Sequence, residues 1–331
     1  MLASGYSRKV CYNNFVRLKL DENRGDMMDR KIIEKFVLSA LIIMGCSAVG
    51  GLIWANSQNR LAQQAIIAEE AEKEPGVESD AYILAKGDYS NLEELLTDVD
   101  KPVYDRYTLK QRQEKGLPTM LPPLAVYNKE KVAYLTFDDG PDNKNTLAIL
   151  DILKANGIHG TFYVTGKMCE ENPTVLKRIF DEGHAIGNHS YDHDYKRLYQ
   201  SKDSFLAEMQ QTDDIIFNIL GVRPFIIRAP GGTVGMFSAE YYPALTEAGY
   251  VEHDWNVSSE DATPKRPNAA RQIKFVDSMT KEDLKDNMAL VLMHCCGGKE
   301  ETVKALQGII DVLKAKGYRF GVVTPITPQP W

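Results

Sequence analysis

Short runs with strand-like composition recur along the C-terminal two thirds of the chain. Runs of a few apolar residues that are bounded by polar or turn residues predict buried strands. They occupy residues 132–137, 160–164, 185–188, 225–228, 250–255, 289–293 and 320–323. We therefore expect seven strands in this part of the chain.

Helices are predicted in most of the gaps between these strands. Leu147, Leu150 and Leu153 line one face of a segment after the first strand. Asn172 and Pro173 predict the N-cap and first position of a second helix. Further helices are expected near residues 202–220, 238–248 and 300–317. Strands alternating with helices predict an α/β fold, built as a parallel barrel or an open sheet.

A longer apolar run lies near the N-terminus. Residues 36–55 contain no charged side chain and as a helix would cover about 30 Å, the thickness of a bilayer's hydrocarbon core. Residues 1–35 carry eight Lys or Arg against five acidic residues, whereas residues 56–80 carry two against six. The positive-inside rule therefore predicts a single-pass protein of the cell membrane, with a cytoplasmic N-terminus and the remaining chain extracellular.

A cleaved signal peptide is the alternative for this run. Its apolar region is typically about 7–15 residues long and precedes a small-residue cleavage site. The run is longer than that, and residues 55–58 make a poor site, so an uncleaved anchor is favoured. Met27 or Met28 would make a conventional start for such an anchor, which leaves the true start open between these residues and Met1.

The stretch after the anchor has the composition of a stalk. It is rich first in Ala, Gln and Glu and finally in proline, without sustained periodicity. The expected organisation is a cytoplasmic segment, a transmembrane anchor, an extracellular stalk or linker and a folded domain, at residues 1–35, 36–55, 56–128 and 129–328.

Charge and cysteine content narrow the class of partner and the redox chemistry. The chain has a net charge of −7, although residues 1–35 contribute +3, so the remainder is strongly acidic. This argues against nucleic acid as a partner.

Cys169, Cys295 and Cys296 follow the anchor. An odd number with two neighbours excludes a disulfide framework, but leaves free thiols, a vicinal bridge and a bridge from Cys169 open.

Two polar motifs directly follow predicted strands. Asp138 and Asp139 end the first strand, and His189 and His193 follow the third. Taken singly, the histidines would more often form a structural pair on a helix, and Asp138 would be a turn aspartate. Together, two nitrogens and one carboxylate can hold a divalent ion with an open position, while the second carboxylate acts as a base. The combination predicts metal-assisted hydrolysis.

Three further segments complete an ordered set. The five segments are TFDDGP, HSYDH, RAPGG, DWNVSSED and LVLMH, at residues 136–141, 189–193, 228–232, 254–261 and 290–294. In this order they resemble the motifs of the polysaccharide deacetylase family (the NodB-homology domain, carbohydrate esterase family 4), over roughly residues 130–325. The chain looks most like membrane-anchored bacterial peptidoglycan N-acetylglucosamine deacetylases. The resemblance implies a distorted (β/α) barrel of about seven parallel strands and removal of acetyl groups from sugars.

The resemblance also implies how the first motifs act. Asp139, His189 and His193 match the ligands of one divalent ion, usually Zn²⁺, with Co²⁺, Mn²⁺ and Ni²⁺ as alternatives. Asp138 matches the catalytic base. Arg228 matches the residue that pairs with this base, keeping it charged and oriented.

The later motifs match the remaining roles. His294 matches the general acid that protonates the leaving sugar amine, and Asp261 the carboxylate that raises the pKa of this histidine. Gly231 matches the position whose backbone N–H meets the developing oxyanion. Trp255 matches an aromatic wall near the acetyl methyl group, and Tyr191 is assigned to the same substrate site. Alone, His294 and Trp255 would as readily be core residues.

Two positions depart from the family pattern. Gly231 stands where many relatives have a bulkier residue, which predicts a more open groove floor. Cys295 and Cys296 follow His294 where relatives often have a polar residue, and thiols there would be able to bind metal or oxidise. Of the other histidines, we expect structural roles for His159 and His184 and assign none to His253.

These features predict a membrane-anchored, metal-dependent N-deacetylase of a cell-surface glycan. Peptidoglycan N-acetylglucosamine is the leading substrate, because the anchor and stalk place the domain within reach of a wall. The alternatives are chitin oligomers, poly-N-acetylglucosamine, muramic acid residues and acetylated xylan. An inactive glycan-binding module is disfavoured because no chemical position is missing, and a small-molecule amidohydrolase is disfavoured by the anchor. The sequence does not decide the oligomeric state.

Overall fold

The computed structural model describes residues 82–84, 99–117, 119, 130–282 and 284–330. Among these residues, no helix combines the length and the apolar character that crossing a bilayer requires. The predicted cytoplasmic segment and the predicted anchor at residues 36–55 lie outside the described residues.

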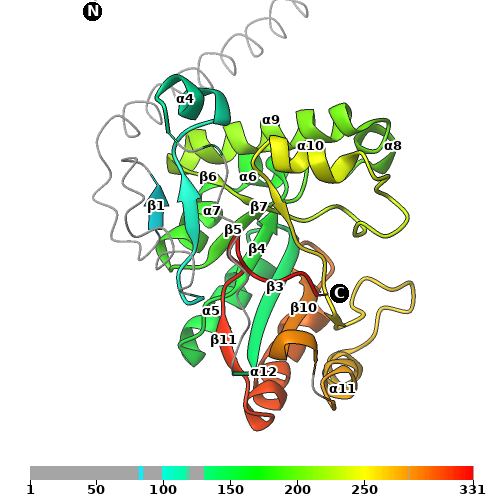
Figure 1. Ribbon diagram of the computed structural model, residues 1–331. Coiled ribbons are helices and arrows are strands. Elements are labelled where there is room, and N and C mark those ends of the chain that lie inside the picture. Colours follow the sequence, from blue (N-terminus) through cyan, green and yellow to red (C-terminus); the bar gives the residue numbers. More distant parts are fainter. Residues whose placement is uncertain (1–81, 85–98, 118, 120–129, 283, 331) are drawn as a thin grey trace, which may run out of the picture. The chain divides into compact units, whose positions relative to one another are not determined.

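A curled, parallel sheet forms the centre of the fold (Figure 1). Its strands follow the order β8-β7-β5-β4-β3-β10-β9, and β11 pairs with β3. In the described part of the chain, β8 and β9 do not pair with each other, so the sheet is a half-barrel. The strands are β3 (Val132–Gly140), β4 (Thr161–Val164), β5 (Ala185–Asn188), β7 (Ile226–Ile227), β8 (Val251–Glu252), β9 (Val257–Ser258), β10 (Met288–His294) and β11 (Arg319–Gly321).

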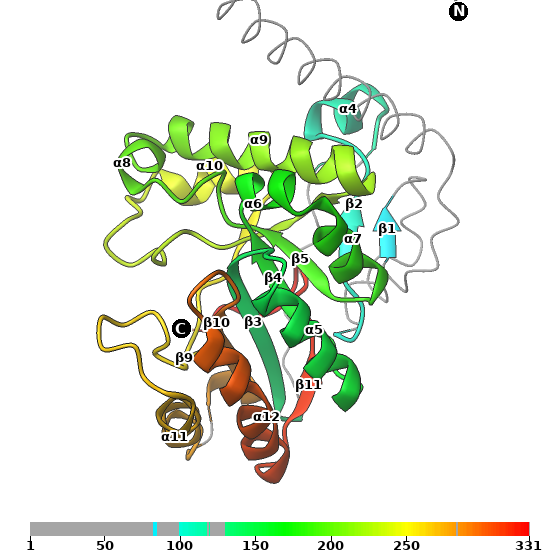
Figure 2. The ribbon, with the colours of Figure 1, turned by 180° about the vertical axis from the view of Figure 1, so that it is seen from behind.

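Helices cover the outer face of this sheet in a continuous series (Figure 2). α11 packs on α12, α12 on α5, α5 on α7 and α7 on α9. The helices are α5 (Asn145–Asn156), α6 (Gly166–Glu171), α7 (Pro173–Asp181), α8 (Tyr195–Leu198), α9 (Lys202–Leu220), α10 (Tyr241–Glu247), α11 (Ala269–Met279) and α12 (Glu300–Ala315), with a 3₁₀ turn at Lys285–Asn287.

Residues of β3 alternate between two cores, as side chains of a strand must. Ala133, Leu135 and Phe137 join the core beneath the helices, whereas Val132 and Tyr134 join the core inside the half-barrel. By the same alternation, Asp138 faces inward at the C-terminal end of β3. The corresponding positions of two other strands place Arg228 and His294 on this inner face as well, because Ile226, Met288 and Leu290 belong to the inner core.

The predicted α/β class and parallel sheet are confirmed, with local corrections. α9 has the predicted bounds, whereas α10 and α12 are shorter than predicted and α11 was not predicted. The predicted strand at 250–255 is interrupted: only Val251–Glu252 pairs with β7, and Val257–Ser258 pairs separately with β10. Between them, Asn256 bonds through its side chain to Met288 O and Leu290 N, at 2.9 and 2.8 Å, and its backbone N–H donates to Leu290 O at 3.3 Å, so this residue joins the segment to β10.

The N-cap predicted at Asn172 is only positional. Asn172 precedes Pro173 at the start of α7, but its side chain makes no capping bond. Its amide instead donates to Pro141 O at 3.0 Å, which ties this helix start to the segment after β3.

The folded unit extends beyond its predicted start at residue 129. A small sheet of β1 (Tyr82–Leu84), β2 (Val103–Asp105) and β6 (Arg223–Pro224) includes residues that were assigned to the stalk, as does α4 (Leu109–Glu114). The buried Tyr104 hydroxyl donates to His184 O at 3.2 Å and accepts from Ile186 N at 2.8 Å. These bonds join the segment to β5, a pairing that proline-rich, aperiodic sequence does not reveal.

Candidate active site

The two adjacent carboxylates at the end of β3 face the same end of the half-barrel because the strand is irregular there. The register between β3 and β4 shifts between Asp138 and Gly140, and Asp139 adopts a positive φ of 70°. In a regular strand, neighbouring side chains would face opposite sides of the sheet. The bulge lets Asp139 turn toward the same end of the half-barrel as Asp138, and Asp tolerates this left-handed conformation better than most residues.

The two histidines lie on the loop between β5 and α8. This differs from the helical pair considered as the alternative. Ser190 and His193 both have positive φ, 70° and 63°, and the Ser190 hydroxyl accepts a hydrogen bond from His193 N at 3.1 Å. This tight loop folds back, so that the rings of His189 and His193 lie with centroids 5.2 Å apart.

Asp139, His189 and His193 form a cluster suited to a metal ion. Asp139 Oδ1 lies 3.5 Å from His189 Nε2 and 3.4 Å from His193 Nε2. Tetrahedral ligation at about 2.0–2.2 Å separates ligand atoms by roughly 3.3–3.6 Å, close to these distances. Among the described residues, Asp139 Oδ1 is buried without a hydrogen-bond donor. A buried, unpartnered carboxylate oxygen between two imidazole nitrogens fits a bound divalent cation.

His189 is held in the form that a metal ligand requires. Its Nδ1 lies 2.8 Å from Arg228 O, which accepts only if Nδ1 carries the proton, so Nε2 presents a lone pair to the cluster. Burial lowers the pKa of His189 to about 3. The ring is therefore neutral at physiological pH and free of a competing proton.

Arg228 connects Asp138 to the centre of the fold. Its fully buried guanidinium donates to Asp138 Oδ1 at 2.9 Å and to Thr136 Oγ1 at 2.6 Å. It also donates to the carbonyl oxygens of His253 and Asp254, at 2.9 and 3.1 Å, and lies over the Tyr163 ring. Five contacts leave this side chain a single geometry.

Asp138 has one oxygen occupied and one directed at the cluster. Oδ1 accepts from Arg228, while Oδ2 lies 3.7 Å from His189 Nε2. Burial raises the pKa of Asp138 above its ordinary value, and the charges of Arg228 and His294 oppose that rise. A carboxylate with a raised pKa is a stronger base than an exposed one, which suits proton abstraction next to the cluster.

His294 lies beside Asp138 on the neighbouring strand and is oriented by Asp261. In the register of β10 and β3, His294 is the partner of Asp138. Asp261 Oδ1 lies 2.8 Å from His294 Nδ1, and Asp261 Oδ2 accepts from His294 N at 2.9 Å and from Thr302 Oγ1 at 2.8 Å. Burial alone would lower the pKa of His294, but the bond to Asp261 and its charge outweigh burial and raise it. The raised pKa favours the protonated ring. Because Nδ1 is bonded to Asp261, Nε2 is the nitrogen that remains available to donate a proton.

The loop after Arg228 presents a free backbone donor. Gly231 is exposed with a φ of 79°, and in the described part of the chain no acceptor is found for its N–H. Asp254 fixes the loop from below, accepting from Thr233 N at 3.1 Å. Trp255 lies against Gly232, where an added Cβ would be 3.0 Å from the indole. The roles expected for Gly231 and Trp255 stay predictions.

In the described part of the chain, Tyr191 makes no side-chain hydrogen bond to another predicted site residue. Its hydroxyl donates to Glu170 of α6 at 3.1 Å. The tyrosine beside the cluster is Tyr195, whose ring meets His193 edge-on at 5.1 Å. Sequence reasoning missed Tyr195 because it lies outside the five motifs. It also missed the supporting roles of Thr136 and Asp254, which lie within two of the motifs, and of Thr302, which lies outside them and gave no signal.

The three described cysteines are free thiols, which is one of the alternatives that the sequence leaves open, and neither possible bridge is formed among them. Cys169 and Cys295 are buried, and Cys295 Sγ donates to Asp138 O. Cys296 is half-buried, with Sγ 3.7 Å from Asp139 Oδ2. The thiol thus contacts the carboxylate oxygen that faces away from the histidines, and lies behind the cluster rather than within it.

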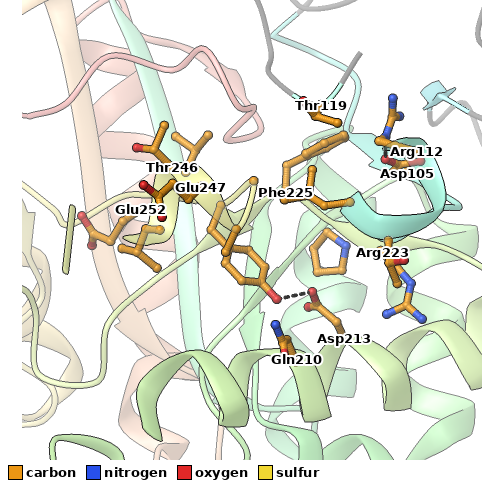
Figure 3. A pocket seen from close by; sticks show the side chains of 18 of the residues that line it. Asp105, Arg112, Thr119, Gln210, Asp213, Arg223, Phe225, Thr246, Glu247 and Glu252 are labelled. Carbon is orange, nitrogen blue, oxygen red and sulfur yellow. Dashed lines mark hydrogen bonds and ion pairs between the residues drawn. The ribbon is translucent and has the colours of Figure 1, made fainter. Parts of the chain in front are cut away.

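A separate cavity of about 920 Å³ lies between the α4 segment, α9 and α10 (Figure 3). Figure 3 shows Glu252 and Thr246 at one end, with Arg112 and Arg223 at the other. None of the predicted site residues lines it. The chemistry described above is therefore confined to the C-terminal end of the parallel strands, as expected for this type of sheet.

Comparisons with known proteins agree with this geometry. Residues 125–253 match the family model described as polysaccharide deacetylase. A peptidoglycan-N-acetylglucosamine deacetylase of Bacillus cereus is 33% identical over 58% of this chain and 69% of its own length. The peptidoglycan-N-acetylmuramic acid deacetylase PdaA of Bacillus subtilis is 33% identical over 58% and 70%.

Solved structures extend the likeness to the fold. A CE4 esterase of Streptococcus mutans matches with a TM-score of 0.56 and 31% identity, over 65% of this chain and 91% of that chain. The catalytic domain of a peptidoglycan N-acetylglucosamine deacetylase from Eubacterium rectale matches with a TM-score of 0.56 and 33% identity, over 62% and 94%. From these similarities, and from a cluster assembled out of its motifs, it follows that the chain belongs to the polysaccharide deacetylase family.

Proposed function

We propose that the chain is a divalent-metal-dependent N-deacetylase that releases acetate from peptidoglycan N-acetylglucosamine. The observation that carries this proposal is the division of labour between two neighbouring carboxylates. Asp139 shares a cluster with two histidines, while Asp138 is held outside that cluster by Arg228 with one oxygen left free.

The residues that would hold the ion are Asp139, His189 and His193. When bound there, a divalent cation such as Zn²⁺ supplies Lewis acidity that polarises an acetyl carbonyl and favours ionisation of water. Asp138 accepts the proton of the attacking water through Oδ2, because Arg228 occupies Oδ1. The Gly231 N–H donates to the oxyanion that develops on the acetyl oxygen.

His294 completes the reaction by protonating the departing amine. An amine anion is a very poor leaving group, so amide hydrolysis needs an acid that carries a proton at working pH. The raised pKa of His294, caused by Asp261 against the effect of burial, supplies such an acid. This acid favours an amide over an ester as the substrate, because alkoxides leave more readily.

Two kinds of support point to peptidoglycan. This chain covers more than two thirds of the length of relatives named as peptidoglycan N-acetylglucosamine and N-acetylmuramic acid deacetylases. The apolar run at residues 36–55 and the charge asymmetry around it favour an anchored, extracellular domain. We therefore propose that the protein acts on the wall from the outer surface of the cell membrane.

Acetate release by the full chain, loaded with Zn²⁺ and given purified peptidoglycan, tests the proposal. Wild type should release acetate, and a chelator should abolish the release. Asp138→Asn should reduce the rate by about 10²–10⁴-fold with the metal still bound. The matched control is Asp181→Asn at the exposed end of α7, which should leave the rate unchanged. Turnover retained by Asp138→Asn would overturn the assignment of the base.

A further inference from the structure

Gly231 and Gly232, in the loop after Arg228, leave room for two aromatic side chains. A Cβ atom added at Gly231 would lie 2.9 Å from the Tyr195 hydroxyl oxygen and 3.0 Å from its Cε1. A Cβ at Gly232 would lie 3.0 Å from the ring of Trp255. The loop that presents the Gly231 N–H is therefore contacted by Tyr195 at one glycine and by Trp255 at the next.

Tyr195 occupies the space that a side chain at position 231 would enter. The more open groove floor that Gly231 predicted is not what the structure has, because Tyr195 reaches this place from α8. Its ring stands edge-on to His193, with ring centroids 5.1 Å apart. Tyr195 therefore lies beside both the candidate metal ligands and the Gly231 N–H.

Neighbouring aromatic residues hold this ring in position. Tyr199 packs beside Tyr195, with ring centroids 5.9 Å apart, and its hydroxyl donates to Pro230 O at 2.6 Å. Two tyrosines of one short segment thus bracket the Pro230–Gly231 peptide. Tyr199 supports the loop from a half-buried position, whereas Tyr195 is 40% exposed.

The Tyr195 hydroxyl is available to a ligand. Within the described residues it makes no hydrogen bond, although Tyr191 and Tyr199 both use theirs, on Glu170 and Pro230. An exposed aromatic face with a free hydroxyl, fixed beside a reaction centre, has the chemistry that binds a sugar: apolar contact for the ring C–H face and a hydrogen bond for a hydroxyl.

We propose that Tyr195 is a substrate-positioning residue, whose ring packs against the acetylated sugar and whose hydroxyl bonds to it above Gly231. The inference rests on the proposed function for the identity of the sugar. Tyr195 takes no part in proton transfer, so its contribution is to ground-state and transition-state binding alike. Such uniform binding changes KM much more than kcat.

Kinetics with N-acetylglucosamine oligomers test this role in the full, Zn²⁺-loaded chain. Tyr195→Ala should raise KM at least tenfold and change kcat by less than about threefold. Tyr195→Phe keeps the ring and loses one hydrogen bond, so KM should rise about threefold to tenfold. The control is Tyr242→Ala on α10, where the tyrosine is 51% exposed and lines no part of the metal cluster. An unchanged KM in Tyr195→Ala would overturn the proposal.

Two further measurements distinguish a sugar-positioning role of Tyr195 from other roles. Zn²⁺ affinity, measured by calorimetry, should be the same in Tyr195→Ala and wild type; a tenfold loss would assign Tyr195 to the support of His193 and overturn the proposal. Oligomer binding is then measured in the Asp138→Asn background, with and without Tyr195→Ala. A tenfold weaker oligomer affinity in the double variant supports the proposal for Tyr195. This holds even if wild type releases no acetate, because the absence of acetate release would refute only the proposed function.

Discussion

Replacing Arg228 by Met is expected to destabilise the chain in a strongly pH-dependent manner. Arg228 is completely buried and makes its ion pair with Asp138, which is 3% exposed. Methionine fills much of the same volume but donates no hydrogen bond. The substitution therefore leaves the Asp138 carboxylate buried without its counter-charge.

The size of the effect follows from the geometry of this pair. Removing one partner of a buried, hydrogen-bonded ion pair costs about 3–5 kcal/mol, because the other charge remains uncompensated. With a urea m-value of about 3 kcal/mol/M, the unfolding midpoint should fall by about 1–2 M. Without Arg228, the pKa of Asp138 rises further above its unfolded value. Folded Asp138 then retains a proton that the unfolded chain releases, so the loss of stability grows as pH rises.

Urea unfolding of the metal-free full chain at pH 5 and pH 8 measures this effect. Arg228→Met should lose more stability, relative to wild type, at pH 8 than at pH 5. Adding Asp138→Asn removes the buried charge, so the double variant should recover part of the loss at pH 8. A loss below about 1 kcal/mol at pH 8, or an equal loss at both pH values, would refute the reasoning about a buried, uncompensated carboxylate.

Three other outcomes are expected. Asp139→Ala should weaken Zn²⁺ binding, measured by calorimetry, by more than the roughly 10–100-fold typical of a lost outer partner, and affinity equal to that of Asp138→Asn would contradict the ligand assignment. Asp261→Asn removes the group that raises the pKa of His294, so kcat should decline at a lower pH than in wild type; an alkaline limb that does not move would argue against His294 as the acid. Burial and the charge of Asp139 raise the pKa of Cys296 to about 12, so at pH 8 its thiol should react with iodoacetamide far more slowly than free cysteine, as followed by mass spectrometry against Cys296→Ser. Labelling as fast as free cysteine would contradict a protonated thiol.

The sequence predicts the long strands and the family better than the boundaries of the fold. Strands such as β3 and β10 are apolar along their length and were recognised from composition alone. β8 and β9 are two residues each and pair with different neighbours, β7 and β10, and this interruption is not visible in the composition. The segment around Tyr104 was read as stalk because its contacts are made to residues some 80 positions away.

The site shows the same distinction. Candidate metal ligands and proton-transfer groups have unusual residue types at fixed spacings, so Asp138, Asp139 and His294 could be proposed from the motifs. Tyr195 could not, because the role proposed for it depends on the space beside Gly231, and a tyrosine in a polar segment carries no signal of its own. The glycine was visible in the sequence, but what filled the space was not.

The measurement that bears most directly on the account is acetate release from peptidoglycan by the full chain, before chelation, after chelation and after Zn²⁺ is restored. We expect release that disappears with the chelator and returns with the metal in wild type, and no return in Asp139→Ala, which lacks a ligand. Release that persists after complete removal of the metal would contradict the central claim that Asp139, His189 and His193 form the working metal centre of a deacetylase.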